Sequence, residues 1–288
     1  MAQAARQVIF PYGMQLFYCA EAQRGRERRE LESMMNKLVK DFAKLLEERG
    51  LVIEDEDKVS QVPNADYTFA KQIYKSREVL VPLMLKLAIC ANEKETALYN
   101  ISYKGGMLIV RQFLQNIVDQ FLDNLRKSEL VSRWCRKDDC QYEISLPQEE
   151  TKLRFFRSAW AEQAFRYVIM KTVHEFCNSN KISYRTFQNV NLRRKGGTNL
   201  FTELDLVVQI EKRFYVFEIK SGPWINIIQW AKREMALVQN DDCVRNIVCT
   251  IYDSIPEKIF EPQLLLKLNN IESKLNELLK LDFESRKL

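Results

Sequence analysis

Apolar positions in the first half of the chain recur at steps of three and four residues, which is the period of an amphipathic helix. The pattern predicts helices over residues 26–49, 67–91 and 107–125, with an interruption of the second near Pro82 and a stop of the first at Gly50. Shorter apolar runs at 8–12, 51–54 and 142–146 are compatible with strands. We therefore expect a helix-rich N-terminal domain over residues 1–150, of unknown role.

The pattern changes after a polar, proline-containing stretch from Arg136 to Thr151. The remaining sequence predicts a helix, three strands, a helix and a strand, at about residues 158–177, 182–191, 202–210, 213–220, 224–238 and 245–252. We expect the second and third strands to form a hairpin about Glu211 and Lys212. The order predicts an α/β domain over residues 151–288, and the whole chain is then an α/β protein of two domains.

A last helix is predicted from about Pro262, with Leu268, Ile271, Leu275 and Leu278 at heptad-like spacing. Two heptads are too few to predict a coiled coil. The apolar stripe is compatible with packing on the domain and also with a dimer seam.

Composition favours a soluble globular protein, because 46% of the residues are hydrophobic and charges interrupt every long apolar run. The longest such run, Glu78 to Ala91, contains Pro82 and Lys86 and is too short to span a bilayer. The N-terminus lacks the apolar region of a signal peptide. We therefore expect no membrane association and a cytoplasmic location.

Cysteine and histidine contents argue against several kinds of site. The seven cysteines are scattered, and an odd number in a chain of 288 residues is typical of reduced thiols. Cys135 and Cys140 are close in sequence, but no second pair completes a zinc site. His174 is the one histidine, which argues against multi-histidine metal centres and histidine-based triads.

The net charge of +5 permits a nucleic-acid partner without requiring one. Glycine is scarce, with 8 residues, and neither a phosphate-binding loop of the GxxxxGK[ST] type nor a GxGxxG turn is present. A nucleotide-triphosphate motor and a dinucleotide-binding fold are therefore not expected.

Acidic residues fall on two predicted strands that are otherwise largely apolar, and in the second of them Glu218 lies near the C-terminal end. Side chains alternate along a strand, so Glu218 and Lys220 share one face of the segment 213–220. Glu203 and Asp205 share one face of the preceding segment, and a hairpin about Glu211 would bring Asp205 close to Glu218. Two neighbouring carboxylates repel each other, and a divalent cation is the usual remedy.

A third carboxylate is placed by the helix that precedes the strands. Glu162 shares a helical stripe with Phe165, Ile169 and Val173. Three carboxylates and an ammonium group suit phosphodiester hydrolysis, with Mg²⁺ or Mn²⁺ bound by Asp205, Glu218 and Glu162, the last directly or through water. Lys220 would then orient water or stabilise the developing negative charge.

The segments "ELDLVV" and "FEIKSG" resemble the two strand motifs of the PD-(D/E)XK nuclease superfamily, with Asp205, Glu218 and Lys220 at its signature positions. Together with "LRFFRSAWAEQAFRYVI", they resemble the endonuclease domains of CRISPR ancillary effectors, although Ala159 and Ile219 replace a glycine and a cysteine of that branch. The resemblance covers about residues 153–252. It implies a restriction-endonuclease-like αβββαβ core and Glu162 as the helical acid.

Basic and polar residues near these motifs are candidates for nucleic-acid contact. Arg193, Arg194 and Lys195 lie in a glycine-bearing turn between the first two strands, which is either a solvated loop or a phosphate-binding arm. The resemblance implies that a polar residue of the helix after Lys220 faces the site, and Gln229 and Lys232 are the candidates.

The resulting prediction is a Mg²⁺- or Mn²⁺-dependent endonuclease of DNA or RNA, with a role in anti-phage or CRISPR-associated defence. The alternative is an inactive nucleic-acid-binding or regulatory module on a nuclease-like scaffold, with Glu218 and Lys220 as an ordinary ion pair. A homodimer is compatible with cutting both strands of a duplex. We do not expect a cyclic oligoadenylate activator, because the first half of the chain reads as helical and lacks the threonines of the effectors' sensor loop.

Overall fold

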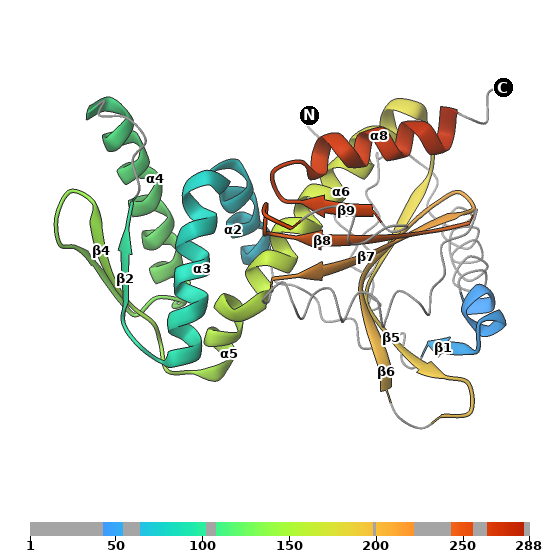
Figure 1. The fold of residues 1–288 in the computed structure, drawn as a ribbon, viewed down its shortest axis with the longest axis horizontal. Helices are drawn as coiled ribbons and strands as arrows, with labels where there is room; N and C mark the ends of the chain where they lie inside the picture. Colours follow the sequence, from blue (N-terminus) through green and yellow to red (C-terminus); the bar gives the residue numbers. More distant parts are fainter. Residues whose placement is uncertain are drawn as a thin grey trace, which may run out of the picture.

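The computed structural model describes residues 43–53, 64–101, 108–197, 200–221, 243–255 and 264–284. Within them the chain forms a six-stranded mixed sheet, a three-stranded antiparallel sheet and several helices, so the predicted α/β class is confirmed. In Figure 1 the small sheet with helices α2, α3 and α4 lies on one side, and the large sheet lies on the other. The predicted helix over 224–238 and the predicted strand over 8–12 lie outside the described residues.

The large sheet has the strand order β1-β5-β6-β7-β8-β9, and β5, β6 and β7 form an antiparallel meander within it. Its members are β1 (Leu51–Ile53), β5 (Tyr184–Arg194), β6 (Leu200–Ile210), β7 (Arg213–Lys220), β8 (Val244–Thr250) and β9 (Leu264–Lys267). β8 runs parallel to β7, and β9 runs parallel to β8. The predicted hairpin between β6 and β7 is confirmed, with Glu211 in the left-handed region at φ 52°.

Apolar side chains cover both faces of the large sheet. One face packs on α6 (Trp160–Asn180) and α8 (Ile271–Glu284), and Phe217, Ile219 and Ile247 belong to this larger core. The other face carries Phe214 and Val216 in a smaller cluster that also includes Leu46 and Leu51. Glu218 and Lys220 alternate with Phe217 and Ile219, and they therefore project from the face of the smaller cluster.

α6 is preceded by α5 (Glu150–Arg154) and by one turn of π-helix, Phe155–Ala159, so the predicted helix begins earlier than expected. A π-turn shifts the phase of the residues after it, and such turns are frequent next to functional sites. The shift here directly precedes the first turn of α6, which contains Glu162.

The N-terminal half contains α2 (Asn64–Lys75), α3 (Arg77–Glu93) and α4 (Leu108–Lys127). α4 agrees with the predicted helix over 107–125. The expected interruption at Pro82 is wrong, because the break lies at Ser76 and Pro82 is inside α3. The buried stripe of α3 continues through the proline, so its packing offsets the one backbone hydrogen bond that proline cannot make.

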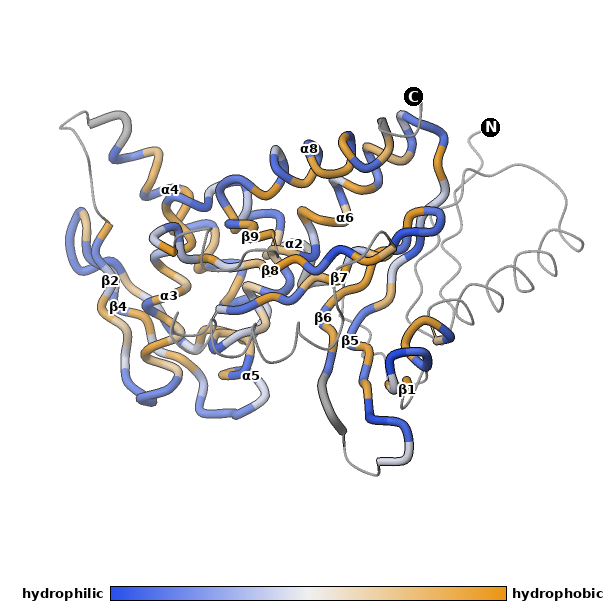
Figure 2. The backbone as a smooth tube through the Cα atoms, turned by 45° about the vertical axis from the view of Figure 1, so that its right-hand side comes forward, coloured by the Kyte–Doolittle hydropathy of each residue, from blue (hydrophilic) through white to orange (hydrophobic). Residues whose placement is uncertain are grey.

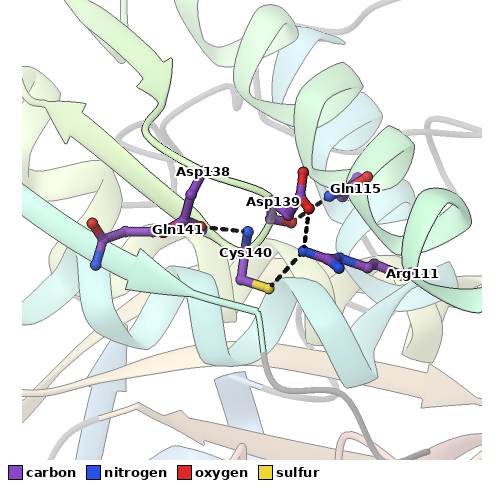
Figure 3. Close-up of polar contacts among 6 residues, drawn as sticks. All are labelled: Arg111, Gln115, Asp138, Asp139, Cys140 and Gln141. Carbon is purple, nitrogen blue, oxygen red and sulfur yellow. Dashed lines mark hydrogen bonds and ion pairs between the residues drawn. The ribbon is translucent and has the colours of Figure 1, made fainter. Parts of the chain in front are cut away.

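Strands β2 (Ala97–Asn100), β3 (Arg133–Arg136) and β4 (Gln141–Ser145) form the small sheet, in the order β2-β4-β3. Of these three, only β4 was predicted. The turn between β3 and β4 is held by Asp138, whose carboxylate accepts hydrogen bonds from the backbone N–H groups of Cys140 and Gln141 at 2.7 and 2.8 Å (Figure 3). Arg111 of α4 pairs with Asp139 at 2.7 Å and donates to the Cys140 sulfur, which ties this turn to the helix.

The predicted helix from Pro262 is wrong in its first part. Residues 264–267 form the edge strand β9, because three consecutive leucines supply an apolar strand that pairs with β8. Asn270 then precedes α8, with its side-chain oxygen accepting a hydrogen bond from the Lys267 N–H at 2.9 Å. Ile271, Leu275 and Leu279 are fully buried in the larger core, so the apolar stripe of α8 packs on the domain.

Strand β1 agrees with the expected strand at 51–54, but its place in the fold differs from expectation. It pairs with the end of β5, with Leu51 opposite Arg194, so residues from the N-terminal half complete the large sheet. The division of the chain near residue 150 remains a prediction, but residues 43–53 pack with the C-terminal sheet.

Candidate functional site

The candidate site lies where strands β6 and β7 separate. Their antiparallel pairing ends at Leu206 opposite Phe217. From there β6 continues only beside β5, whereas β7 continues beside β8 as far as Lys220 opposite Thr250. The fork between the two strands is visible in Figure 1. The next residue of each strand is acidic, Asp205 on β6 and Glu218 on β7, so a carboxylate occupies each side of the fork.

Asp205, Glu218 and Lys220 meet at this fork, as the strand pattern predicts. The Lys220 ammonium nitrogen lies 2.5 Å from Oε1 of Glu218 and 3.9 Å from Oδ2 of Asp205. The Asp205 carboxylate also accepts a hydrogen bond from the backbone N–H of Ile219 at 2.7 Å. The Glu218 side chain is 4% exposed and that of Asp205 is 13% exposed, so both carboxylates are largely removed from water.

Burial and mutual repulsion raise the pKa of Glu218 well above its usual range. Loss of hydration is the largest cause, the Asp205 charge adds to it, and the Lys220 ammonium opposes it. A carboxylate in water has no such penalty. The site therefore holds one more negative charge than Lys220 alone can balance when both acids are ionised, and an added cation would relieve that imbalance.

Glu162 of α6 is close enough to the pair to sense its charge. Burial raises the pKa of Glu162, the Asp205 charge raises it further, and Arg166 and Lys220 lower it. Its carboxylate lies 3.6 Å from the Arg166 guanidinium on the next turn of the helix. The helix thus directs this acid toward the fork, beside a buried cation that the sequence pattern did not reveal.

The donor set suits a hard divalent cation, because carboxylate oxygens are the ligands that Mg²⁺ and Mn²⁺ prefer. In the described part of the chain, no group of three or more His, Cys, Asp or Glu side chains is placed to hold a metal ion. Asp205 and Glu218 therefore form a two-carboxylate pair, and Glu162 stands beside that pair without joining it in this structure.

Arg193, Arg194 and Lys195 lie at the far end of β5, where Figure 2 shows a hydrophilic tip beyond the apolar middle of the strand. Arg194 and Lys195 are exposed and Arg193 is half-buried. The turn is fixed from one side, because the Lys195 N–H donates to the Gly50 carbonyl at 2.8 Å. Gln229 and Lys232 lie outside the described residues.

Two residues at the site were missed by the sequence reasoning. Arg166 was not considered, although it lies four residues after Glu162 on the same helical stripe, and its side chain is 4% exposed. Asn189 looked like an ordinary strand residue, yet it adopts φ 51°. The one available signal was the i, i+4 spacing of Glu162 and Arg166, which is typical of a helical ion pair.

The other candidate groups have ordinary roles. His174 is half-buried, with Nδ1 3.0 Å from the Tyr184 hydroxyl and Nε2 2.9 Å from the Asn178 amide. The described cysteines, which include Cys135 and Cys140, are free thiols. Among the described helices, none has the length and apolar character needed to cross a membrane.

No protein-family model and no curated protein matches this sequence. Among solved structures, the chain is similar to the crystal structure of protein VC1899 from Vibrio cholerae, with 14% sequence identity and a TM-score of 0.49. The similarity covers 84% of this chain and 61% of that chain, so this chain spans less than two thirds of that protein's length. A similarity of this degree assigns no function.

Proposed function

We propose that this chain is a metal-dependent nuclease that hydrolyses phosphodiester bonds of DNA or RNA, with a PD-(D/E)XK type of site. One observation carries the proposal: two largely buried carboxylates from diverging strands, Asp205 and Glu218, share one ammonium group, Lys220. Burying an unbalanced negative charge costs stability and is typical of functional sites. A role in anti-phage or CRISPR-associated defence rests on the sequence resemblance alone.

The residues of the fork have distinct roles in this proposal. Asp205 and Glu218 bind the cation, and Lys220 stabilises the negative charge that develops on the phosphate or orients the attacking water. A divalent cation, when bound, supplies polarisation of the phosphate and a lower pKa of its bound water. The larger exposure of Lys220, 26% against 4% for Glu218, places the ammonium group on the solvent side, where a phosphate would arrive.

Support for the fold comes from the strand order. An antiparallel meander followed by a parallel strand, with α6 packed on one face, agrees with the αβββαβ arrangement that the resemblance implies. Asp205 lies in the middle of the second strand of the meander, where the pairing with β7 ends, and Glu218 lies near the C-terminal end of the third strand.

The test is cleavage by the purified full chain of plasmid DNA, linear duplex, single-stranded DNA and single-stranded RNA, with Mn²⁺, Mg²⁺ or a chelator. We expect metal-dependent cleavage of at least one substrate, and a loss of about 100-fold or more in Asp205→Asn, Glu218→Gln and Lys220→Ala. The matched control is Glu203→Gln, which removes the same charge from an exposed position two residues from Asp205.

Two results would reject the proposal. Cleavage that persists in Asp205→Asn and Glu218→Gln would come from another site or a contaminant. Absence of cleavage with every substrate, together with nucleic-acid binding by wild-type protein, would favour the inactive binding module instead.

A further inference from the structure

Arg166 is a buried cation that lies beside the proposed catalytic site. Its Nη2 atom is 3.6 Å from Oε2 of Glu162 and donates a hydrogen bond to Oδ1 of Asn189. Its Nε atom is buried and makes no hydrogen bond within the described part of the chain. A buried guanidinium with an unsatisfied donor is costly, and an apolar side chain of similar volume would stabilise this position at least as well. Stability alone therefore does not account for arginine here.

Asn189 occupies an irregular point of the β5–β6 ladder. The pairs on either side of it are Gln188 with Leu206 and Val190 with Leu204, so its register partner is Asp205. The Asn189–Asp205 pair is left out of the regular ladder, and Asn189 has a left-handed backbone at φ 51°. Asparagine tolerates this conformation better than most residues. The local turn of the backbone coincides with the side chain's contact to Arg166.

Arg166 contacts both Glu162 and Asn189, and Asn189 lies at the register position opposite Asp205. Glu162 lies on α6, Asp205 lies on β6, and Arg166 together with Asn189 spans the space between the helix and the sheet. A carboxylate on a long side chain has several rotamers, and a fixed partner reduces them to one orientation.

We propose that Arg166 and Asn189 are positioning residues that hold the Glu162 carboxylate at the edge of the Asp205–Glu218 pair. The inference rests on the proposed function, because the geometry matters only if the pair binds a cation. Neither residue touches the cation or the substrate. Their role resembles that of the outer partners that orient ligands at other metal sites.

Variants of Asn189 separate the side chain from the backbone. Asn189→Gly keeps the left-handed backbone at no steric cost and removes the acceptor for Arg166. Asn189→Asp keeps an acceptor at the same position and also tolerates a positive φ. Arg166→Gln removes the cation, and Arg166→Lys keeps the charge but loses the planar group that reaches both partners. Thermal unfolding in chelator identifies the variants that fold.

The readouts are the Mn²⁺ dissociation constant, measured by calorimetry on protein without nucleic acid, and the cleavage rate at saturating Mn²⁺. We expect folded Arg166→Gln, Arg166→Lys and Asn189→Gly, measured below their own melting temperatures, to weaken Mn²⁺ binding or cleavage by about 10-fold to 100-fold. Asn189→Asp keeps the acceptor for Arg166 and is expected to be less impaired than Asn189→Gly, although it adds a negative charge opposite Asp205. A role of the backbone alone would not explain that difference.

Three outcomes would overturn the inference. In the first, folded Arg166→Gln and Asn189→Gly bind Mn²⁺ and cleave as the wild type does, which leaves the proposed function intact. In the second, Asn189→Asp is as impaired as Asn189→Gly, so the acceptor is not what matters. In the third, the wild type neither binds Mn²⁺ nor cleaves, and the proposed function fails together with the inference.

Discussion

The Asp205 carboxylate accepts a hydrogen bond from the backbone N–H of Ile219, with 2.7 Å between Oδ2 and nitrogen. This N–H lies just beyond the last regular pair of β6 and β7, where the strand ladder no longer supplies an acceptor. An unpaired buried N–H costs about 1–3 kcal/mol. The Asp205 side chain thus joins β6 to β7 by a hydrogen bond at the fork, in addition to its proposed role in binding a cation.

The two roles of Asp205 are separable by substitution. Asp205→Asn keeps a side-chain oxygen for the Ile219 N–H, whereas Asp205→Ala leaves that N–H without an acceptor. We expect Asp205→Asn to be more stable than Asp205→Ala by about 1–3 kcal/mol. For a domain of this size each kcal/mol corresponds to about 2–4 °C in melting temperature. Thermal unfolding at pH 7 in chelator measures the difference, and equal melting temperatures would show that the hydrogen bond contributes nothing.

Glu218→Gln is expected to stabilise the protein while removing activity. The folded-state pKa of Glu218 is raised by burial and by Asp205, so the folded protein retains a proton that the unfolded chain releases. Wild-type stability therefore falls as the pH rises from the ordinary glutamate value to the raised one, and the penalty is complete above it. The Glu218→Gln protein has no such penalty. Its melting temperature should therefore exceed that of the wild type by a margin that grows as the pH rises from about 4 to about 8.

The measurement is thermal unfolding of both proteins across that pH range in chelator. Added Mn²⁺ should raise the melting temperature of the wild type and leave Glu218→Gln unchanged, because only the wild type retains both ligands. A Glu218→Gln protein that is less stable than the wild type at the alkaline end of the range would contradict the prediction. It would mean that the ion pair with Lys220 outweighs the cost of burial.

We expect the basic turn at the end of β5 to contribute to nucleic-acid binding, because its cations attract the phosphates. Replacement of Arg193, Arg194 and Lys195 by alanine should reduce the slope of log affinity against log salt concentration by about 0.7–0.9 for each phosphate that is no longer neutralised. Fluorescence anisotropy provides the measurement over a series of salt concentrations, on Asp205→Asn protein, which is expected to bind nucleic acid without cutting it.

The matched control replaces two exposed lysines that belong to helices and not to the basic turn, Lys127 of α4 and Lys280 of α8. That variant should keep the original slope. If the variant of the turn also keeps it, the three cations are a solvated loop, which was the other interpretation of the sequence.

The sequence predicted β6, β7 and their hairpin well, because alternation and continuous burial are local signals. It also brought Asp205, Glu218 and Lys220 together, since a two-residue turn determines which residues face each other. β2, β3 and β9 were missed because they are short. β2 and β9 also depend on partners elsewhere in the chain, β4 and β8, whereas β3 pairs with β4 across a short turn.

Arg166 and Asn189 could not be found in the same way. The burial of Arg166 depends on the packing of α6 against the sheet, and the left-handed backbone of Asn189 depends on where the ladder is interrupted. Neither property produces a periodic pattern of apolar and polar residues in the sequence. The pairing of β1 with β5 was missed for a related reason, since more than a hundred positions of chain separate the partners.

The pairing of β1 with β5 limits where the chain can be cut into fragments that still fold. Leu46 and Leu51 shield one side of the C-terminal sheet, and the Gly50 carbonyl accepts a hydrogen bond from the backbone of the basic turn. A fragment that starts at residue 151 would leave β5 as a bare edge and uncover apolar surface near Val190 and Val216. The acidic fork and the segment 43–53 therefore belong to one folding unit, even though more than half of the sequence runs between them.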